Sequence, residues 1–84
     1  MSQIDKLKHS FRDCRSTFRY CDFERLLAAA GFDKIKAGAS GGSRRKFMHR
    51  TTKVMIWLDE PHGDEMKPAM VRRLRVQLER LGLI

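Results

Sequence analysis

The short connections between three predicted strands constrain the fold of this chain more than any other feature of its sequence. The alternation of side chains predicts strands at 32–37, 43–49 and 53–58, of which the last two form a hairpin. The glycine-rich reversal at 38–43 and the turn at 49–53 are too short to contain a crossover helix. The three strands are therefore expected to pair as an antiparallel meander.

Three helices are expected around these strands. The first covers about residues 2–12, the second begins at an Asp22 N-cap and ends at Gly31, and the third begins at Pro68 and ends at Gly82. The apolar side chains at helical spacing are Ile4, Leu7 and Phe11, then Phe23, Leu26, Leu27 and Ala30, and finally Met70, Leu74, Leu78 and Leu81. The expected fold is α+β, in the order helix, helix, three strands, helix, with the antiparallel sheet backed by helices.

Length and composition limit the classes of protein to which the chain can belong. Its 84 residues suffice for one small domain. No apolar run approaches the roughly 20 residues that cross a bilayer, and the first residues lack the apolar segment of a signal peptide. We expect a cytoplasmic protein with reduced thiols at Cys14 and Cys21 and no membrane partner. The two cysteines, His49 and His62 lack the spacing of zinc ligands, so neither metal nor cofactor is expected.

Positive charge is concentrated in one stretch of the chain. The formal net charge is +8, with 18 Lys and Arg against 10 Asp and Glu. Residues 44–53 contain five Lys or Arg and no acid, whereas residues 59–65 contain four acids and no base. Such a distribution is typical of a surface that attracts a polyanion, with a generic basic surface as the alternative.

The start of the predicted hairpin is a candidate phosphate site. Backbone amides of the reversal that ends at Ser43 can approach a phosphate, and Arg44, Arg45 and Lys46 add positive charge. The alternative is a plain hairpin connection beside a solvated basic strand. Trp57 lies in a predicted strand whose two faces are both apolar, and burial beneath a helix is favoured over stacking on a base.

His62 is the candidate general acid or base. It lies between a strand and a helix with acids on both sides, and an imidazole titrates near neutral pH. RNA carries its own nucleophile, the 2′-hydroxyl, so cleavage requires only its deprotonation, its alignment and stabilisation of charge on the phosphate. The alternative is a loop histidine bonded to the adjacent helix. His49 is interpreted as a solvated hairpin residue.

Three stretches of the chain together resemble a known family. They are Cys21–Phe32 (CDFERLLAAAGF), then Gly42-Ser43 followed by basic residues and Phe47, and finally Pro61-His62-Gly63 leading through Met66-Lys67-Pro68 into the last helix. In this order and spacing, with the closing Leu81-Gly82-Leu83, they are similar to small toxins of the HicA type, which are mRNA interferases of bacterial toxin–antitoxin pairs. The resemblance covers residues 20–84 and leaves 1–19 as an N-terminal accessory helix and connection.

The resemblance implies a fold similar to a double-stranded RNA-binding domain, metal-independent cleavage of mRNA, and neutralisation by a HicB-type antitoxin. The expected catalytic residues are His62 and Arg44. The residues expected to contact RNA are Ser43, Arg44, Arg45, Lys46, Arg50 and Lys53.

Arg44 stands where the family typically has a histidine regarded as catalytic, and an arginine cannot give up its proton at neutral pH. Three interpretations follow: the chain is an inactive relative or variant, Arg44 stabilises phosphate charge while His62 transfers the proton, or the substrate differs. The leading hypothesis is a HicA-like toxin. The alternatives are a non-catalytic RNA-binding module of the same fold and a basic docking domain for an acidic partner protein.

Overall fold

The structure is a computed structural model that describes residues 3–35 and 44–84, except for the side chain of His62. Its helices are α1 (Gln3–Asp13), α2 (Tyr20–Ala29) and α3 (Pro68–Arg80), with a single 3-10 turn, η1 (His62–Asp64). Its strands are β1 (Phe18–Arg19), β2 (Phe32–Ile35), β3 (Arg44–His49), β4 (Met55–Asp59) and β5 (Glu65–Met66).

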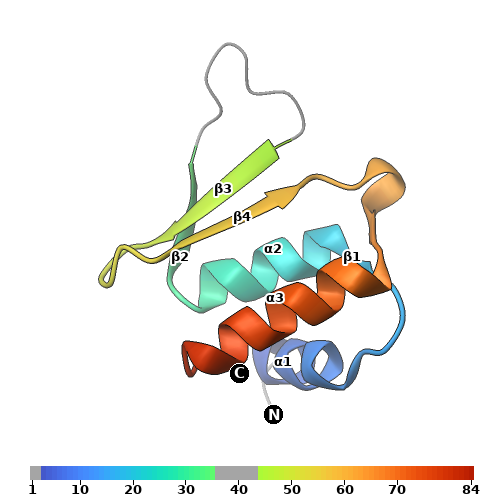
Figure 1. Ribbon diagram of the computed structural model, residues 1–84. Coiled ribbons are helices and arrows are strands. Elements are labelled where there is room, and N and C mark those ends of the chain that lie inside the picture. The colour runs from blue at the N-terminus through green and yellow to red at the C-terminus, as the bar shows by residue number, and fades with distance from the viewer. Residues whose placement is uncertain (1–2, 36–43) are drawn as a thin grey trace.

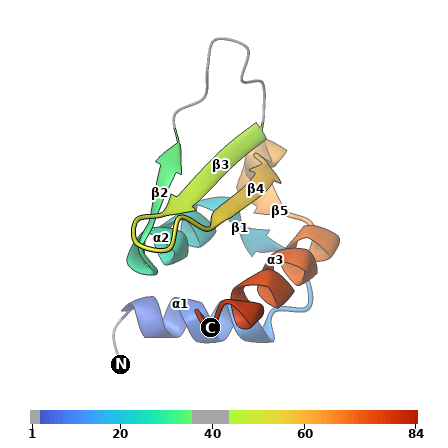
Figure 2. The same cartoon turned by 60° about the vertical axis from the view of Figure 1, so that its left-hand side comes forward.

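A three-stranded antiparallel sheet and three helices form the domain. The strand order is β2-β3-β4, and both strand pairs are antiparallel. Figures 1 and 2 show α2 and α3 against one face of this sheet and α1 on the far side of those helices. No described helix covers the other face, which we call the open face. The predicted α+β class and antiparallel sheet are confirmed.

The core lies between the sheet and the helices and extends down to α1. Ile56 and Leu58 of β4 and Phe47 of β3 are buried on the helix side of the sheet. Phe11 of α1 is fully buried and contacts Phe18 and Phe23, with ring centroids 5.1 and 5.2 Å apart. The helix at the N-terminus therefore contributes to the same core as the sheet.

The glycines and the proline that were predicted to bound the second and third helices agree with the structure, but the predicted start of α2 does not. Gly31 and Gly82 have left-handed backbones, with φ of 101° and 74°, directly after Ala30 and Leu81, the C-cap residues of α2 and α3. Pro68 is the first residue of α3. The prediction of Asp22 as an N-cap is wrong, because α2 begins two residues earlier and its N-cap position is Arg19.

The sequence did not predict a second, two-stranded sheet. In it, β1 pairs antiparallel with β5, so that Phe18 lies opposite Met66. This pairing holds the segment after η1 beside the start of α2. Short strands of two residues have too little alternation to be recognised from sequence.

Two details of the expected elements require correction, and one lies outside the described residues. β4 begins at Met55 rather than 53, and β2 is described to Ile35, so the predicted strand residues 36 and 37 lie outside the described part. Leu81 was predicted on the buried side of the last helix, but its side chain is 38% exposed. Within the described residues, no helix combines the length and apolar character that crossing a membrane would require.

Candidate nucleic-acid interface

β3 divides the predicted cations between the two faces of the sheet. Arg44 and Lys46 lie on the open face, while Arg45 shares the helix side with buried Phe47. In the sheet register, Lys46 pairs with Ile35 on one side and Trp57 on the other. The open face therefore carries both charged and apolar side chains.

Trp57 is exposed rather than buried beneath a helix, so the sequence prediction of burial is wrong. Its side chain is 42% exposed on the open face. The Lys46 ammonium nitrogen lies 4.5 Å from the ring centroid, a cation–π contact. Both faces of β4 carry apolar residues, and the helices cover the face that carries Ile56 and Leu58.

The first residues of β3 are tied to the acidic end of β4. Arg45 donates to the Glu60 carboxylate at 2.9 Å, and Arg44 lies 3.7 Å from a carboxylate oxygen of Asp59. The Arg45 side chain is only 21% exposed, whereas both members of the Arg44 pair are mostly exposed. The more buried pair fixes the segment that leads into η1, and the exposed pair leaves Arg44 accessible.

η1 is anchored at its other end to α2. Asp64 accepts a hydrogen bond from the backbone N–H of Cys21 at 2.9 Å and lies 3.6 Å from Arg19. Asp64 thereby caps the first turn of α2, which Arg19 does not do with its own side chain. Hydrogen bonds from the Cys21 thiol and backbone N–H, and then the charge of Arg19, lower the pKa of Asp64, while the bond between the Cys21 thiol and the Asp64 carboxylate raises the pKa of the thiol.

These contacts place the loop between β4 and α3 at one end of the hairpin. His62 begins η1, two residues after Glu60 and two before Asp64. Both neighbours are fixed, Glu60 to Arg45 and Asp64 to the start of α2. The side chain of His62 and the whole of Ser43 lie outside the described residues.

The structure does not bring Arg50 and Lys53 to this end. They lie in the turn at the opposite end of β3, roughly 17 Å from Arg45 at about 3.3 Å per strand residue. Arg50 pairs with Asp33 at 3.6 Å. The predicted RNA-contacting set therefore falls into two groups, one beside η1 and one at the turn.

His49 is a framework residue, not the solvated hairpin residue that was predicted. Its Nδ1 accepts hydrogen bonds from the backbone N–H groups of Thr51 and Thr52, at 3.1 and 3.2 Å. Its Nε2 must therefore carry the proton that is donated to the Ala30 carbonyl, 3.1 Å away. The ring ties the turn to the end of α2.

Buried Tyr20 lies behind the loop end of the hairpin. Its hydroxyl has no hydrogen-bond partner among the described groups. Burial, with a smaller effect of the Glu24 charge, raises the pKa of Tyr20 to about 12, so the phenol stays neutral at physiological pH.

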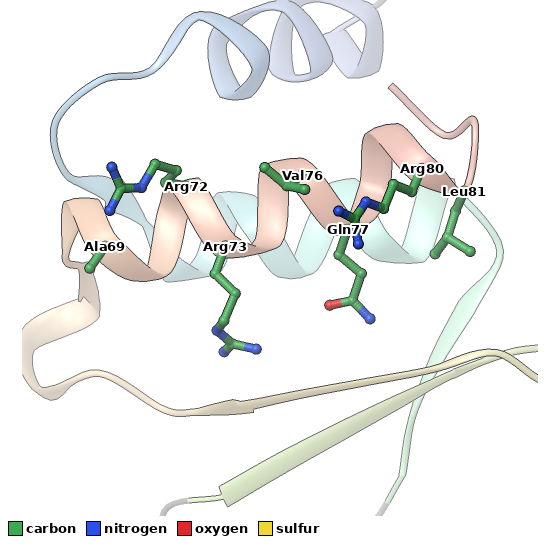
Figure 3. A pocket seen from close by; sticks show the side chains of 7 residues that line it. All are labelled: Ala69, Arg72, Arg73, Val76, Gln77, Arg80 and Leu81. Atoms are coloured by element: carbon green, nitrogen blue, oxygen red, sulfur yellow. The ribbon is translucent and has the colours of Figure 1, made fainter.

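Sequence reasoning did not single out the arginines of α3. Arg72, Arg73 and Arg80 line a groove of about 710 Å³ together with Ala69, Val76, Gln77 and Leu81 (Figure 3). Arg73 donates to the backbone carbonyl of Trp57 at 3.3 Å. Neither Arg72 nor Arg80 has an ion-pair partner within residues 3–35 and 44–84. One signal for these arginines was present in the sequence, because the last predicted helix is rich in cations, but only its apolar side chains were interpreted.

The described residues include no group of three or more His, Cys, Asp and Glu side chains arranged to hold a metal ion. Cys14 and Cys21 are free thiols.

A comparison with known proteins found no matching family model, no matching curated protein and no matching solved structure. The functional assignment therefore depends on the residues and contacts of this chain.

Proposed function

We propose that this chain is a HicA-like toxin of a bacterial toxin–antitoxin pair, with a fold similar to a double-stranded RNA-binding domain. It cleaves mRNA without a metal ion and is neutralised by a HicB-type antitoxin. The order α2, β2, β3, β4, α3 is in accord with that fold.

One observation carries the proposal. The three stretches that resemble the family are far apart in sequence and are joined by two contacts of 2.9 Å. Asp64 after the Pro-His-Gly stretch bonds the Cys21 backbone, and Arg45 after Gly-Ser bonds Glu60. A packing role alone would not need the polar side chains on either side of Pro61-His62-Gly63, Glu60 and Asp64, to bond the start of β3 and the start of α2.

The proposed chemistry uses the 2′-hydroxyl of RNA as the nucleophile. The 2′-oxygen bonds to phosphorus as the bond from phosphorus to the 5′-oxygen breaks, which leaves a cyclic phosphate and a 5′-hydroxyl. His62 takes the proton from the 2′-hydroxyl or gives one to the leaving 5′-oxygen, and water exchanges the other proton. Arg44 and Lys46 bind the phosphate and stabilise the charge that develops on its oxygens. Arg45 holds the loop through Glu60. Arg50 and Lys53 contact RNA only if the RNA strand extends along the hairpin as far as the turn.

Cleavage of purified RNA tests the enzyme claim. The wild-type protein, with a chelator present, should cut mixed transcripts and leave cyclic phosphate ends. His62→Ala should abolish cutting, whereas His9→Ala, at an exposed position in α1, should leave it unchanged. RNA that stays intact with the wild-type protein would remove the enzyme claim.

A non-catalytic RNA-binding module is the second candidate, because Arg44 occupies the family's histidine position and is paired with Asp59. Arg44→His separates the two candidates. If the arginine has cost the chain its activity, this variant should cut RNA faster than the wild type. A pure binder should bind RNA with strong salt dependence and should cut with neither residue at position 44.

The toxin claim is tested in cells. Induced expression should arrest growth, and His62→Ala should relieve the arrest. Co-expression of a small protein encoded beside this chain should also restore growth if that protein is the antitoxin. Growth that continues during wild-type expression would contradict the toxin claim, whatever the protein does to RNA in solution.

A further inference from the structure

We propose that the outer side of α3, together with Trp57 at the edge of the sheet, docks an acidic amphipathic segment of a partner protein. The sequence-based docking hypothesis concerned the basic hairpin, whereas this surface is on a helix. The inference holds whether or not the chain acts on RNA.

The groove residues form one continuous stripe along the helix. Ala69, Arg72, Arg73, Val76, Gln77, Arg80 and Leu81 follow each other at alternating steps of three and one residues. The part of this stripe within α3, from Ala69 to Arg80, is on the side opposite Val71, Leu74 and Leu78, which are buried in the core, and Leu81 follows at the C-cap position. It extends over about 18 Å at 1.5 Å per residue, the length of a three-turn helix.

Exposed apolar side chains are concentrated at this surface. Among the described residues, the large hydrophobic side chains that remain exposed are Trp57, Val76 and Leu81, at 42%, 40% and 38%. Val76 and Leu81 line the groove, and Trp57 lines an adjoining pocket. Arg73 lines both. An apolar patch surrounded by polar groups indicates a protein partner, because RNA phosphates gain nothing from Val or Leu.

The charges specify an acidic occupant. Arg72 and Arg80 lack ion-pair partners among the described side chains, and Arg73 bonds a backbone carbonyl rather than a carboxylate. The one acid near the end of this helix, Glu79, is directed to Arg75 instead. A second copy of this chain is an unfavourable occupant because each copy carries a net charge of +8.

The composition of the surface is that of a binding centre. Trp, Arg and Met are enriched where protein interfaces concentrate their binding energy, and Trp57, Met70 and Arg73 line the same pocket. Figure 3 shows Arg73 and Gln77 projecting from α3 on the side of β4. β4 is the edge strand of the described sheet on this side. An occupant of the groove would therefore also approach Trp57.

A synthetic peptide provides the probe. We would use a 14-residue helix-forming peptide with three Glu residues beside a stripe of Leu, and a scrambled peptide of the same composition. Trp57 is the single tryptophan of the chain, so a change in its emission reports docking at this place. Anisotropy of the labelled peptide gives the affinity.

Two double variants examine the two components of the surface. Arg72→Gln with Arg80→Gln should weaken peptide binding about tenfold, since the variant removes two of the cations that would bind the Glu residues of the peptide. Val76→Gln with Leu81→Gln should weaken it by a similar factor without changing the net charge. The matched control, Lys6→Gln with Arg12→Gln, removes two exposed charges from α1 and should change affinity by less than about twofold.

Three results would overturn the inference. The scrambled peptide could bind as well as the ordered one, the α1 variant could lose as much affinity as the α3 variants, or the α3 variants could weaken only RNA binding. The last result would assign the groove to nucleic acid. If the protein binds the peptide but neither binds nor cuts RNA, the toxin proposal is contradicted and the docking proposal is supported.

Discussion

The two ends of the β3–β4 hairpin are held by different chemistry. At the turn end, His49 bonds the Ala30 carbonyl and two turn amides, and the Arg50 backbone N–H donates to the Gly31 carbonyl at 3.0 Å. At the loop end, Arg44 and Arg45 pair with Asp59 and Glu60. The turn end is held mostly by hydrogen bonds to backbone groups, whereas the first residues of β3, at the loop end, are held by ion pairs.

This difference distinguishes framework from binding surface. Hydrogen bonds to backbone groups fix geometry, and breaking them leaves polar groups without partners. An exposed ion pair contributes only about 0–1 kcal/mol, so a phosphate can take the place of its carboxylate at little cost. Arg44 and Arg50 both lie in exposed ion pairs, at 3.7 and 3.6 Å, but Arg50 also donates to the Ala28 carbonyl at 3.5 Å, whereas the pair of Arg44 is with Asp59 beside the loop. The loop end is where an anionic ligand can enter.

Gly31→Ala should produce the largest loss of stability and act on the turn end alone. A Cβ at residue 31 would lie 2.8 Å from Nε2 of His49, and φ of 101° is unfavourable for alanine. We expect a loss of about 2–4 kcal/mol in the free energy of unfolding, measured by urea denaturation. Gly82→Ala is the control, with φ of 74° but nothing within 4 Å of the added Cβ. Equal losses in the two variants would show that the contact with His49 is unimportant.

His49→Ala should be the next most destabilising change. It removes one bond to Ala30 and two bonds to turn amides, which together contribute about 2–3 kcal/mol. The folded fraction should still bind RNA, and cut it if the enzyme proposal holds, whereas His62→Ala should keep its stability and lose cutting. Denaturation and RNA assays on both variants separate the two roles. Normal stability of His49→Ala would refute the framework role.

Acid should weaken the loop end through Asp64. Hydrogen bonding from Cys21 lowers the pKa of this carboxyl in the folded protein below its usual value of 3.8. Its contribution to stability is therefore complete above that value and is lost as the pH falls through the lowered folded pKa. Melting temperatures of the wild type and Asp64→Asn should differ at pH 6 and converge toward pH 3 and below. A difference that stays constant with pH would exclude this linkage.

Removing one carboxylate from each end tests whether the loop end receives RNA. Asp59→Asn removes the carboxylate that pairs with Arg44 and should tighten RNA binding up to about fivefold. This factor corresponds to the free energy of an exposed ion pair, about 0–1 kcal/mol. Asp33→Asn releases Arg50 at the turn end and changes the net charge equally, so its smaller effect is the control. Filter binding at one fixed salt concentration measures both. Equal tightening would mean that RNA affinity depends on the net charge and not on the position of the removed carboxylate.

The sequence predicted the features that have local signals and missed those that depend on distant residues. Gly31, Pro68 and Gly82 were correctly predicted, because a helix end is determined within a few residues. The cap of α2 was missed because it comes from Asp64, 43 residues from Cys21.

The same distinction holds in the candidate site. The run of cations at 44–53 can be recognised in the sequence. Which cation lies beside which carboxylate depends on the sheet register, which sets Arg44 opposite Asp59. Trp57 was misassigned because an apolar pattern on both strand faces does not indicate which face the helices cover.

Lys53→Gly should have the smallest effect and sharpen the comparison at the turn end. Lys53 has a φ of 63°, a left-handed backbone that disfavours lysine, so glycine should stabilise the fold by about 0.5–1 kcal/mol despite its greater freedom when unfolded. RNA affinity should fall by less than about twofold, whereas Lys46→Gln at the loop end should weaken it several-fold. Denaturation and salt-dependent RNA binding measure the two properties on the same samples. If Lys53→Gly costs as much affinity as Lys46→Gln, RNA reaches the turn and both ends of the hairpin belong to the binding surface.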